Sequence, residues 1–183
     1  MANYCYNSVE ITDFDKQDFH RILTFFEKYD RYDTFTEWGD ALGVDVYSNN
    51  TTSFYKYGTR WWDFSIETSD EDTILVIGDS AWSPPEELCR CVSKAFNCRV
   101  TIEYSEPGMD FAGVSEYLEG VQVKEEHYTY NEFDYMINPD GHLDYLQDWI
   151  VEGHETEEEL IDTISHLSEP HQKEMIEYFN QNK

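Results

Sequence analysis

Positive charge is scarce in this sequence. Its 183 residues include 12 Lys and Arg against 39 Asp and Glu, a net charge of −27. The shortage is greatest after residue 100, where 3 lysines stand against 21 acidic residues, a balance of 3 − 21 = −18. Such a chain has no basic track with which to hold the phosphates of DNA, RNA or an anionic membrane. We therefore expect no direct binding of nucleic acid or membrane, and partners that are basic proteins.

Long apolar runs are also missing, and cysteines are few. No run approaches the roughly 18 residues that a membrane-spanning helix needs. The start of the sequence lacks the basic and apolar regions of a secretory signal peptide. The cysteines, Cys5, Cys89, Cys91 and Cys98, are therefore interpreted as reduced thiols of a cytoplasmic protein. Cys89 and Cys91 stand two apart on an expected helix and point away from each other, which favours core packing over zinc binding.

What is present indicates a folded α+β domain, because 40% of the residues are hydrophobic and 16% aromatic. Period-two alternation predicts strands near 4–11, 62–66 and 98–104, and a continuous apolar run at 74–77 predicts a central strand. Helical periodicity predicts helices over about 15–30 and 84–96. Ser83, Pro84 and Glu86 have the spacing of a capping box at the start of the second helix. The resulting order, βαββαβ, is that of a ferredoxin-like core.

The rest of the chain is expected to append a hairpin and short acidic helices to this core. The hairpin falls at about 117–130, and three helices follow around Leu146, Ile164 and Ile176. Thr156 and Glu159 have the spacing of a further capping box. We divide the chain into a ferredoxin-like core domain, residues 1–113, and an acidic hairpin plus helical C-terminal module, residues 114–183, packed on that core. The long connection at 31–56 has loop composition, and it is an open question whether it contacts a partner.

Four segments spread over about residues 1–113 are distinctive: Met1–Asn7, Tyr57–Trp61, Ala81–Pro85 and Glu106–Gly113. They resemble the signature segments of the YubB-type ferredoxin-like family encoded by phages and plasmids. Tyr4 and Tyr57 stand where Trp is expected. The resemblance implies a ferredoxin-like fold, a mobile-element origin and a bacterial host cytoplasm, and it supplies no catalytic residues. Some acidic proteins resembling this one are anti-CRISPR inhibitors of Cas9.

Residues of the predicted sheet also fit two other functions, a metal-dependent nuclease and an RNA-binding protein. Asp63, Glu67, Asp79 and Asp110 could in principle converge on Mg²⁺ for a nuclease reaction, but no basic track would hold the substrate. Tyr4, Tyr6 and Trp61 project from the face opposite the helices, where RNA-recognition domains stack bases. The negative charge opposes RNA, so packing against the C-terminal module or a protein partner is favoured. We expect a protein that is not an enzyme and has no catalytic residues, metal site or cofactor.

Acidic side chains in the C-terminal part are the candidate partner-binding residues. Several lie at i, i+3, i+4 or i+7 on one helix face, where like charges each cost a few tenths of a kcal/mol. Such carboxylates can occupy phosphate sites in a DNA-binding protein, although they can also serve solubility alone. We predict a counter-defence protein, an acidic DNA mimic that inhibits a DNA-processing nuclease, with a CRISPR effector such as Cas9 with its guide RNA as the leading candidate. The alternative is a non-enzymatic binding module for another basic host protein. The predicted partner-binding residues are Glu116, Glu119, Glu125, Glu126, Asp144, Asp148, Glu152, Glu155, Glu159 and Asp162, with Trp149 as an aromatic anchor. Other aromatic residues among the acids could supply further anchors: Tyr117, Tyr128, Tyr130, Phe133 and Tyr135.

Overall fold

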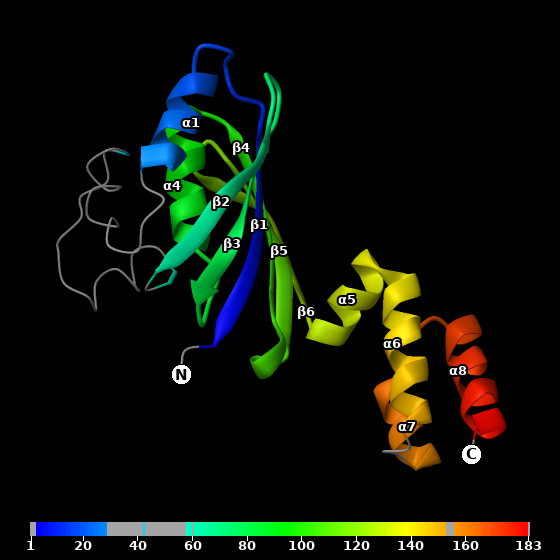
Figure 1. Cartoon of the computed structure of the whole chain (residues 1–183). Helices are drawn as coiled ribbons and strands as arrows, with labels where there is room; N and C mark the ends of the chain where they lie inside the picture. The colour runs from blue at the N-terminus through cyan, green and yellow to red at the C-terminus, as the bar shows by residue number, and fades with distance from the viewer. Residues whose placement is uncertain (1–2, 29–41, 43–57, 60, 153–155, 183) are drawn as a thin grey trace. The chain divides into compact units, whose positions relative to one another are not determined.

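The computed structural model describes residues 3–28, 42, 58–59, 61–152 and 156–182 (Figure 1). Within it the chain forms two compact units, residues 1–127 and 128–183. From the sequence, unit 1 carries 10 basic and 25 acidic residues, a net charge of 10 − 25 = −15, and unit 2 carries 2 − 14 = −12. Apart from residue 42, the connection at 31–56 lies outside the described residues, as do the candidate residue Glu155 and the residues Tyr57 and Arg60.

Unit 1 is built on a six-stranded antiparallel sheet with the order β2-β3-β1-β4-β5-β6. Its strands are β1 (Tyr4–Thr12), β2 (Trp62–Ser69), β3 (Ile74–Ala81), β4 (Arg99–Glu106), β5 (Phe111–Leu118) and β6 (Val121–Tyr128). The first four strands have the order expected of a ferredoxin-like core, with β1 and β3 in the middle. The expected fold class is therefore confirmed, and β5 and β6 extend the sheet beyond β4.

Two helices, α1 (Phe19–Lys28) and α4 (Glu86–Phe96), lie on the same side of this sheet (Figure 1). Their apolar side chains and the inward-facing residues of β1–β4 form one core, in which Phe26 and Leu88 are almost completely buried. All four cysteines are buried and free. Burial raises the pKa of the Cys5 thiol to about 12, as expected for a thiol that serves packing rather than chemistry.

The expected capping box at the start of α4 is wrong. The helix begins at Glu86, after Pro85, and no side chain caps it. The Ser83 hydroxyl instead donates to the carbonyl of Gly58, and the Glu86 carboxylate accepts a 2.5 Å hydrogen bond from Ser115. Hydrogen bonds to residues distant in the sequence therefore take the place of the local bonds that a capping box would make.

The hairpin of β5 and β6 belongs to unit 1. Glu119 and Gly120 both have positive φ, 52° and 79°, the conformation of the tight turns that connect hairpin strands. The β5 strand pairs with β4 over its whole length, from Arg99 opposite Leu118 to Glu106 opposite Phe111. The domain boundary expected after residue 113 therefore falls inside β5, whereas the division into two units falls at the end of β6, between His127 and Tyr128.

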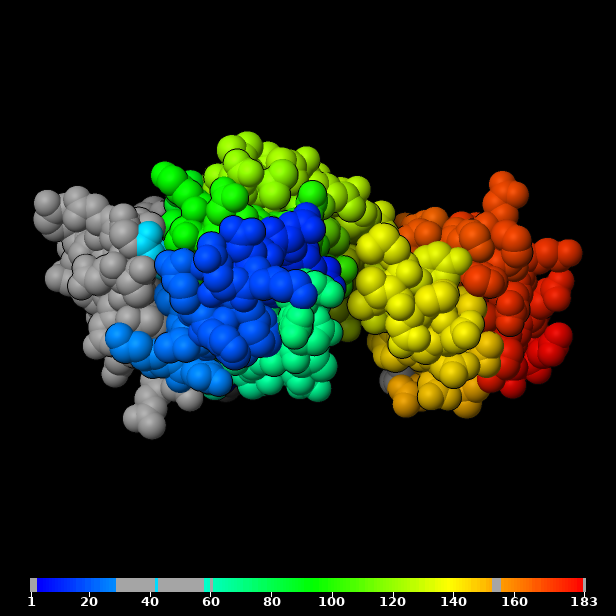
Figure 2. Space-filling view, turned by 90° about the horizontal axis from the view of Figure 1, so that it is seen from above, coloured from blue at the N-terminus to red at the C-terminus, as the bar shows by residue number. Residues whose placement is uncertain are grey.

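Unit 2 consists of α5 (Tyr130–Ile137), α6 (Pro139–Val151), α7 (Glu157–Thr163) and α8 (Glu169–Asn182), which pack into one compact body (yellow to red in Figure 2). Its core is apolar: Leu143, Leu146, Ile150, Leu160, Ile164, Leu167, Met175 and Phe179. The capping box of Thr156 and Glu159 is confirmed at the start of α7. Helix α5 was not predicted from the sequence, although Thr129 and Glu132 form the same kind of box at its start. No helix in the described part of the chain is long and apolar enough to cross a membrane.

Candidate protein-binding surfaces

The sheet of unit 1 has one face covered by α1 and α4. On the other face, which we call the open face, the described residues of unit 1 place no α-helix. Alternation along β1 assigns side chains to these faces, because Cys5, Val9 and Ile11 are buried while Tyr4, Tyr6 and Glu10 are exposed. Residues paired directly across strands share a face. The register therefore places five carboxylates on the open face: Glu10, Asp63, Asp79, Glu103 and Glu116.

The aromatic side chains expected on the open face are there. Tyr4 is 50% exposed and Tyr6 is 53% exposed, values that are high for aromatic residues in the middle of a sheet. The ring of Trp61 meets that of Tyr4 edge-on, with centroids 5.6 Å apart. Tyr6 lies in the same cross-strand row as Asp79 on β3. Aromatic rings beside carboxylates can pack on the stem or the charged group of an Arg or Lys side chain.

Asp63 on β2 lies directly opposite Asp79 on β3. Partial burial and the nearby charge of Asp63 raise the pKa of Asp79. Two carboxylates at a directly opposed pair of sheet positions repel each other and lower the stability of the sheet. This pair has no described basic neighbour, so a cation supplied by a partner would relieve the repulsion.

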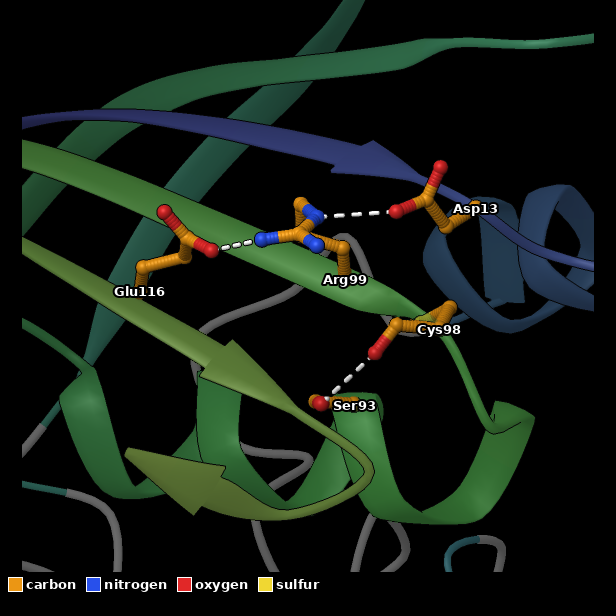
Figure 3. A network of polar contacts seen from close by, with 5 residues as sticks. All are labelled: Asp13, Ser93, Cys98, Arg99 and Glu116. Carbon is orange, nitrogen blue, oxygen red and sulfur yellow. Dashed lines mark hydrogen bonds and ion pairs between the residues drawn. The ribbon is translucent and has the colours of Figure 1, made fainter. Parts of the chain in front are cut away.

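Arg99 is the one basic residue on the open face of β1–β5 in the described register, and it is already bound. Its guanidinium donates to Asp13, with 2.8 Å between Nε and Oδ2, and to the carboxylate of Glu116 (Figure 3). The neighbouring chain segment is anchored by a 2.8 Å hydrogen bond from the Ser93 hydroxyl to the carbonyl of Cys98. Glu116, predicted as a partner-binding residue, therefore already has a partner within the protein.

The other predicted acids of the hairpin also have local roles. Glu126 pairs with Lys124 at 2.8 Å, and Glu125 lies 3.4 Å from the ring of His127. Glu119 occupies the exposed hairpin turn. These residues are on unit 1, whereas the remaining predicted acids are on unit 2. The structure therefore divides the predicted site between two units, and each surface has to be considered by itself.

On unit 2 the exposed face of α6 combines acidic and apolar side chains. We call it the α6 surface; it consists of Asp144, Tyr145, Asp148, Val151 and Glu152, all exposed. Asp144 and Asp148 make no ion pair with any residue that the structure describes, and neither does Asp162 on α7. Glu159 accepts the two capping bonds of Thr156 at 2.8 Å, so it already stabilises the start of α7.

The structure contradicts part of the prediction about aromatic anchors. Tyr117 and Phe133 are wrong as exposed anchors, because both are buried in the structure. Trp149 is only partly buried and packs against the core of unit 2. Tyr145, which sequence reasoning did not single out, is 60% exposed on the α6 surface. The sequence pattern could have indicated that Tyr145 is exposed, because it stands one residue after Asp144 and three before Asp148, outside the apolar stripe of the helix.

Neither surface has the chemistry of a metal site. The described residues contain no group of three or more His, Cys, Asp or Glu side chains that could hold a metal ion. Of the four acids considered for Mg²⁺, the sheet register brings Asp63 and Asp79 opposite each other, while Glu67 stands at the irregularity between Ile66 and Thr68. Asp110 lies beyond β4, at the end of a short 3-10 turn.

A six-stranded antiparallel sheet with helices on one face defines an α+β protein with a ferredoxin-like domain. More particularly, the chain belongs to the family described as the ferredoxin-like domain in Api92-like protein, whose model matches residues 61–164. The match includes β2–β6 and extends through α6 and α7, so it covers much of the acidic part of the chain.

Among solved structures, the crystal structure of the protein Api92 from Yersinia pseudotuberculosis is similar to this chain, with 12% identity and a TM-score of 0.46. The similarity covers 70% of this chain and 98% of that one. No curated protein matches this chain.

Proposed function

We propose that this protein is a non-enzymatic binding protein whose acidic surfaces dock on the basic, DNA-binding cleft of a DNA-processing enzyme. The observation that carries the proposal is the open face of the sheet. There, exposed tyrosines stand among carboxylates, and the single arginine of β1–β5 is already paired. A face of this composition repels phosphates and attracts Arg and Lys side chains.

The spacing of the carboxylates supports this kind of partner. Neighbouring strands lie about 4.8 Å apart, and alternate residues along a strand about 6.7 Å apart. Asp63, Asp79 and Glu103 are therefore close enough to form one surface yet far enough apart for each to meet a separate basic side chain. The α6 surface offers a second acidic set, with Tyr145 and Val151 as apolar contacts. Charges beside exposed aromatic rings are typical of interfaces that combine steering with anchoring.

A nuclease is the favoured partner, with a CRISPR effector such as Cas9 and its guide RNA as the leading candidate. The support is the charge of both units and the resemblance of residues 1–113 to YubB-type proteins of phages and plasmids, which implies a mobile-element origin. A counter-defence role in a bacterial cytoplasm would suit a protein of that origin and charge. Carboxylates would stand in for phosphates on the Arg and Lys side chains that hold DNA or read a PAM. The second candidate is a binding module for another basic host protein, which the same surfaces also fit.

The test is inhibition of DNA cleavage by purified nucleases, including Cas9 loaded with guide RNA, in the presence of the full-length protein. Three variants separate the surfaces. One neutralises Glu10, Asp63 and Glu103 on the open face, and one neutralises Asp144, Asp148 and Glu152 on the α6 surface. The third is a matched control that neutralises two exposed acids elsewhere, Glu27→Gln on α1 and Glu174→Gln on α8.

We expect inhibition of at least one nuclease, relief of that inhibition by excess DNA, and loss of at least tenfold in affinity for one of the first two variants. The control variant should inhibit as the unmodified protein does. Affinity should also fall as salt rises from about 50 to 200 mM, since such contacts are screened over about 10 Å at 0.1 M. Failure to inhibit any nuclease, together with recovery of an unrelated basic protein from host cells, would favour the second candidate.

A further inference from the structure

A cluster of polar side chains lies beside the apolar core of unit 2, where α5, the start of α6 and the turn between α7 and α8 meet. His142 on α6 is only 1% exposed. Its Nδ1 lies 2.7 Å from a carboxylate oxygen of Asp134 on α5, and its Nε2 lies 2.9 Å from Nε2 of His166 in the turn. A buried imidazole thus has both ring nitrogens bonded to titratable groups from two other segments.

Counting hydrogens shows what this chain of contacts can hold. The Asp134 carboxylate can only accept, so His142 carries a hydrogen on Nδ1 and donates it. The two facing Nε2 atoms can share one hydrogen, donated by either ring. A hydrogen on each would place two N–H groups head to head across 2.9 Å, a contact that cannot persist. The contact therefore accepts one hydrogen between the two Nε2 atoms and excludes a second. A hydrogen on Nδ1 of His166, bonded to the backbone of Thr163, does not break the contact, so the excluded proton is the one that would place a hydrogen on both Nε2 atoms.

We propose that Asp134, His142 and His166 form a proton-binding site, and that uptake of the excluded proton separates the turn between α7 and α8 from α6. The turn is attached at a second point close by. The Tyr135 hydroxyl lies 2.7 Å from Nδ1 of His171 and 3.1 Å from the hydroxyl of Ser168. These bonds keep the segment tethered at the start of α8, so the site acts on a local contact of unit 2.

The charged and titratable groups around His166 set the direction of the effect. Burial and the neighbouring His142 lower the pKa of His166 below its usual 6.5, and they outweigh the backbone of Thr163 and the carboxylate of Glu132, which favour its protonated form. The rings of Tyr135 and His142 lie against it with centroids 5.9 and 5.0 Å away. The ring of His171 lies beside that of Tyr135, and the ring of Tyr145 lies beside that of His142.

Because the pKa of His166 is lower when the contact is closed, the open form binds the additional proton more readily. The closed contact is therefore most stable, relative to the open one, above about pH 6.5. Its relative stability falls as the pH drops from 6.5 toward the lowered pKa of His166. One linked proton changes the opening equilibrium by up to tenfold per pH unit. Opening would change the spacing between the acids of α6 and those of α7, and the consequence for partner binding rests on the proposed function.

Hydrogen exchange of the full-length protein without any partner tests the site independently of that function. Backbone amides of residues 157–168 should lose protection by up to tenfold per pH unit below pH 6.5, after correction for the intrinsic pH dependence of exchange. His166→Gln, which keeps a donor and an acceptor but does not titrate, should remove this dependence. The matched control, His127→Gln on β6 of unit 1, should leave it unchanged.

A titration of the imidazole nitrogens of the unmodified protein by NMR gives a second measurement that needs no variant. We expect the ring of His166 to take up its proton below pH 6.5, at the pH where amide protection falls. Uptake of that proton at or above pH 6.5 would overturn the proposal. Equal protection of residues 157–168 at pH 7.5 and 5.5 would overturn it as well, whether or not any nuclease is inhibited.

Discussion

The opposed pair of Asp63 and Asp79 provides a sharp test of the open face as a binding surface. A surface kept for a partner can retain side chains that lower the stability of the free protein. We expect Asp79→Asn to raise the free energy of unfolding at pH 7, because it removes a carboxylate that lies directly opposite another and that is partly buried. The same change should weaken binding of the basic partner.

The magnitude follows from the sheet geometry. Directly opposed pairs on neighbouring strands interact by roughly 0.2–1 kcal/mol, and like charges do so unfavourably. A double-mutant cycle of Asp63→Asn and Asp79→Asn should therefore give a repulsive coupling of about that size at low salt. The coupling should become much smaller in 1 M salt, where the Debye length is about 3 Å.

Urea unfolding at a series of pH values measures both effects. The pKa of Asp79 is raised in the folded protein, so the folded state takes up this proton more readily than the unfolded chain. The advantage of Asp79→Asn is therefore present at neutral pH and disappears as the pH falls through the raised pKa. Glu10→Gln is the matched control, because Glu10 lies opposite Leu75 and Thr101 rather than another acid.

A destabilised Asp79→Asn protein, or a coupling that is zero or attractive, would refute this reasoning. Either result would mean that the two carboxylates already share a cation or a proton in the free protein. A stabilised variant that also binds its partner with unchanged affinity would show instead that the pair lies outside the interface.

Four further outcomes follow from the structure. Phe26→Ala should cost about 3–5 kcal/mol in urea unfolding, because its ring is 1% exposed and meets Trp62 and Phe64 edge-on; a near-unchanged midpoint would contradict its place in the core. Gly78→Ala should disrupt the pairing of β2 and β3, seen as loss of amide protection there, since the added Cβ would lie 2.1 Å from the carbonyl oxygen of Asp63. Thr156→Ala should cost about 1 kcal/mol and reduce protection at the start of α7 by removing a cap, whereas Thr156→Ser should retain it. The purified protein should shift neither DNA nor RNA in gels at low salt, because it has no basic track; submicromolar binding would overturn the interpretation of its charge.

Local patterns predicted most of the elements because each pattern depends on neighbouring residues. Alternation along Tyr4–Thr12 reported which face of β1 is buried, and the apolar run at 74–77 reported a strand in the middle of the sheet. The box of Thr156 and Glu159 formed as expected, because both of its bonds are made within one turn of helix. The same rule failed at Ser83, where the hydroxyl found a partner 25 residues away at Gly58.

The sequence predicted that the candidate site is acidic, but it did not predict which residues form it. The sequence identified the acids, but bonds made by distant residues decide which of them are free for a partner. Glu116 looked available, and Arg99 on the neighbouring strand holds it. Asp63 and Asp79 were considered as metal ligands, and only the register of β2 and β3 showed that they oppose each other on the open face.

By itself, the sequence determined the charge, the absence of a basic track and the βαββαβ order of the first strands and helices, because composition and short-range periodicity are properties of the chain. Tertiary structure decided which acids gather on one face, which of them are paired, and that His142 and His166 meet across 24 residues of chain. The physical reason is that these contacts depend on strand register and helix packing, which the buried apolar side chains set jointly and no single segment encodes.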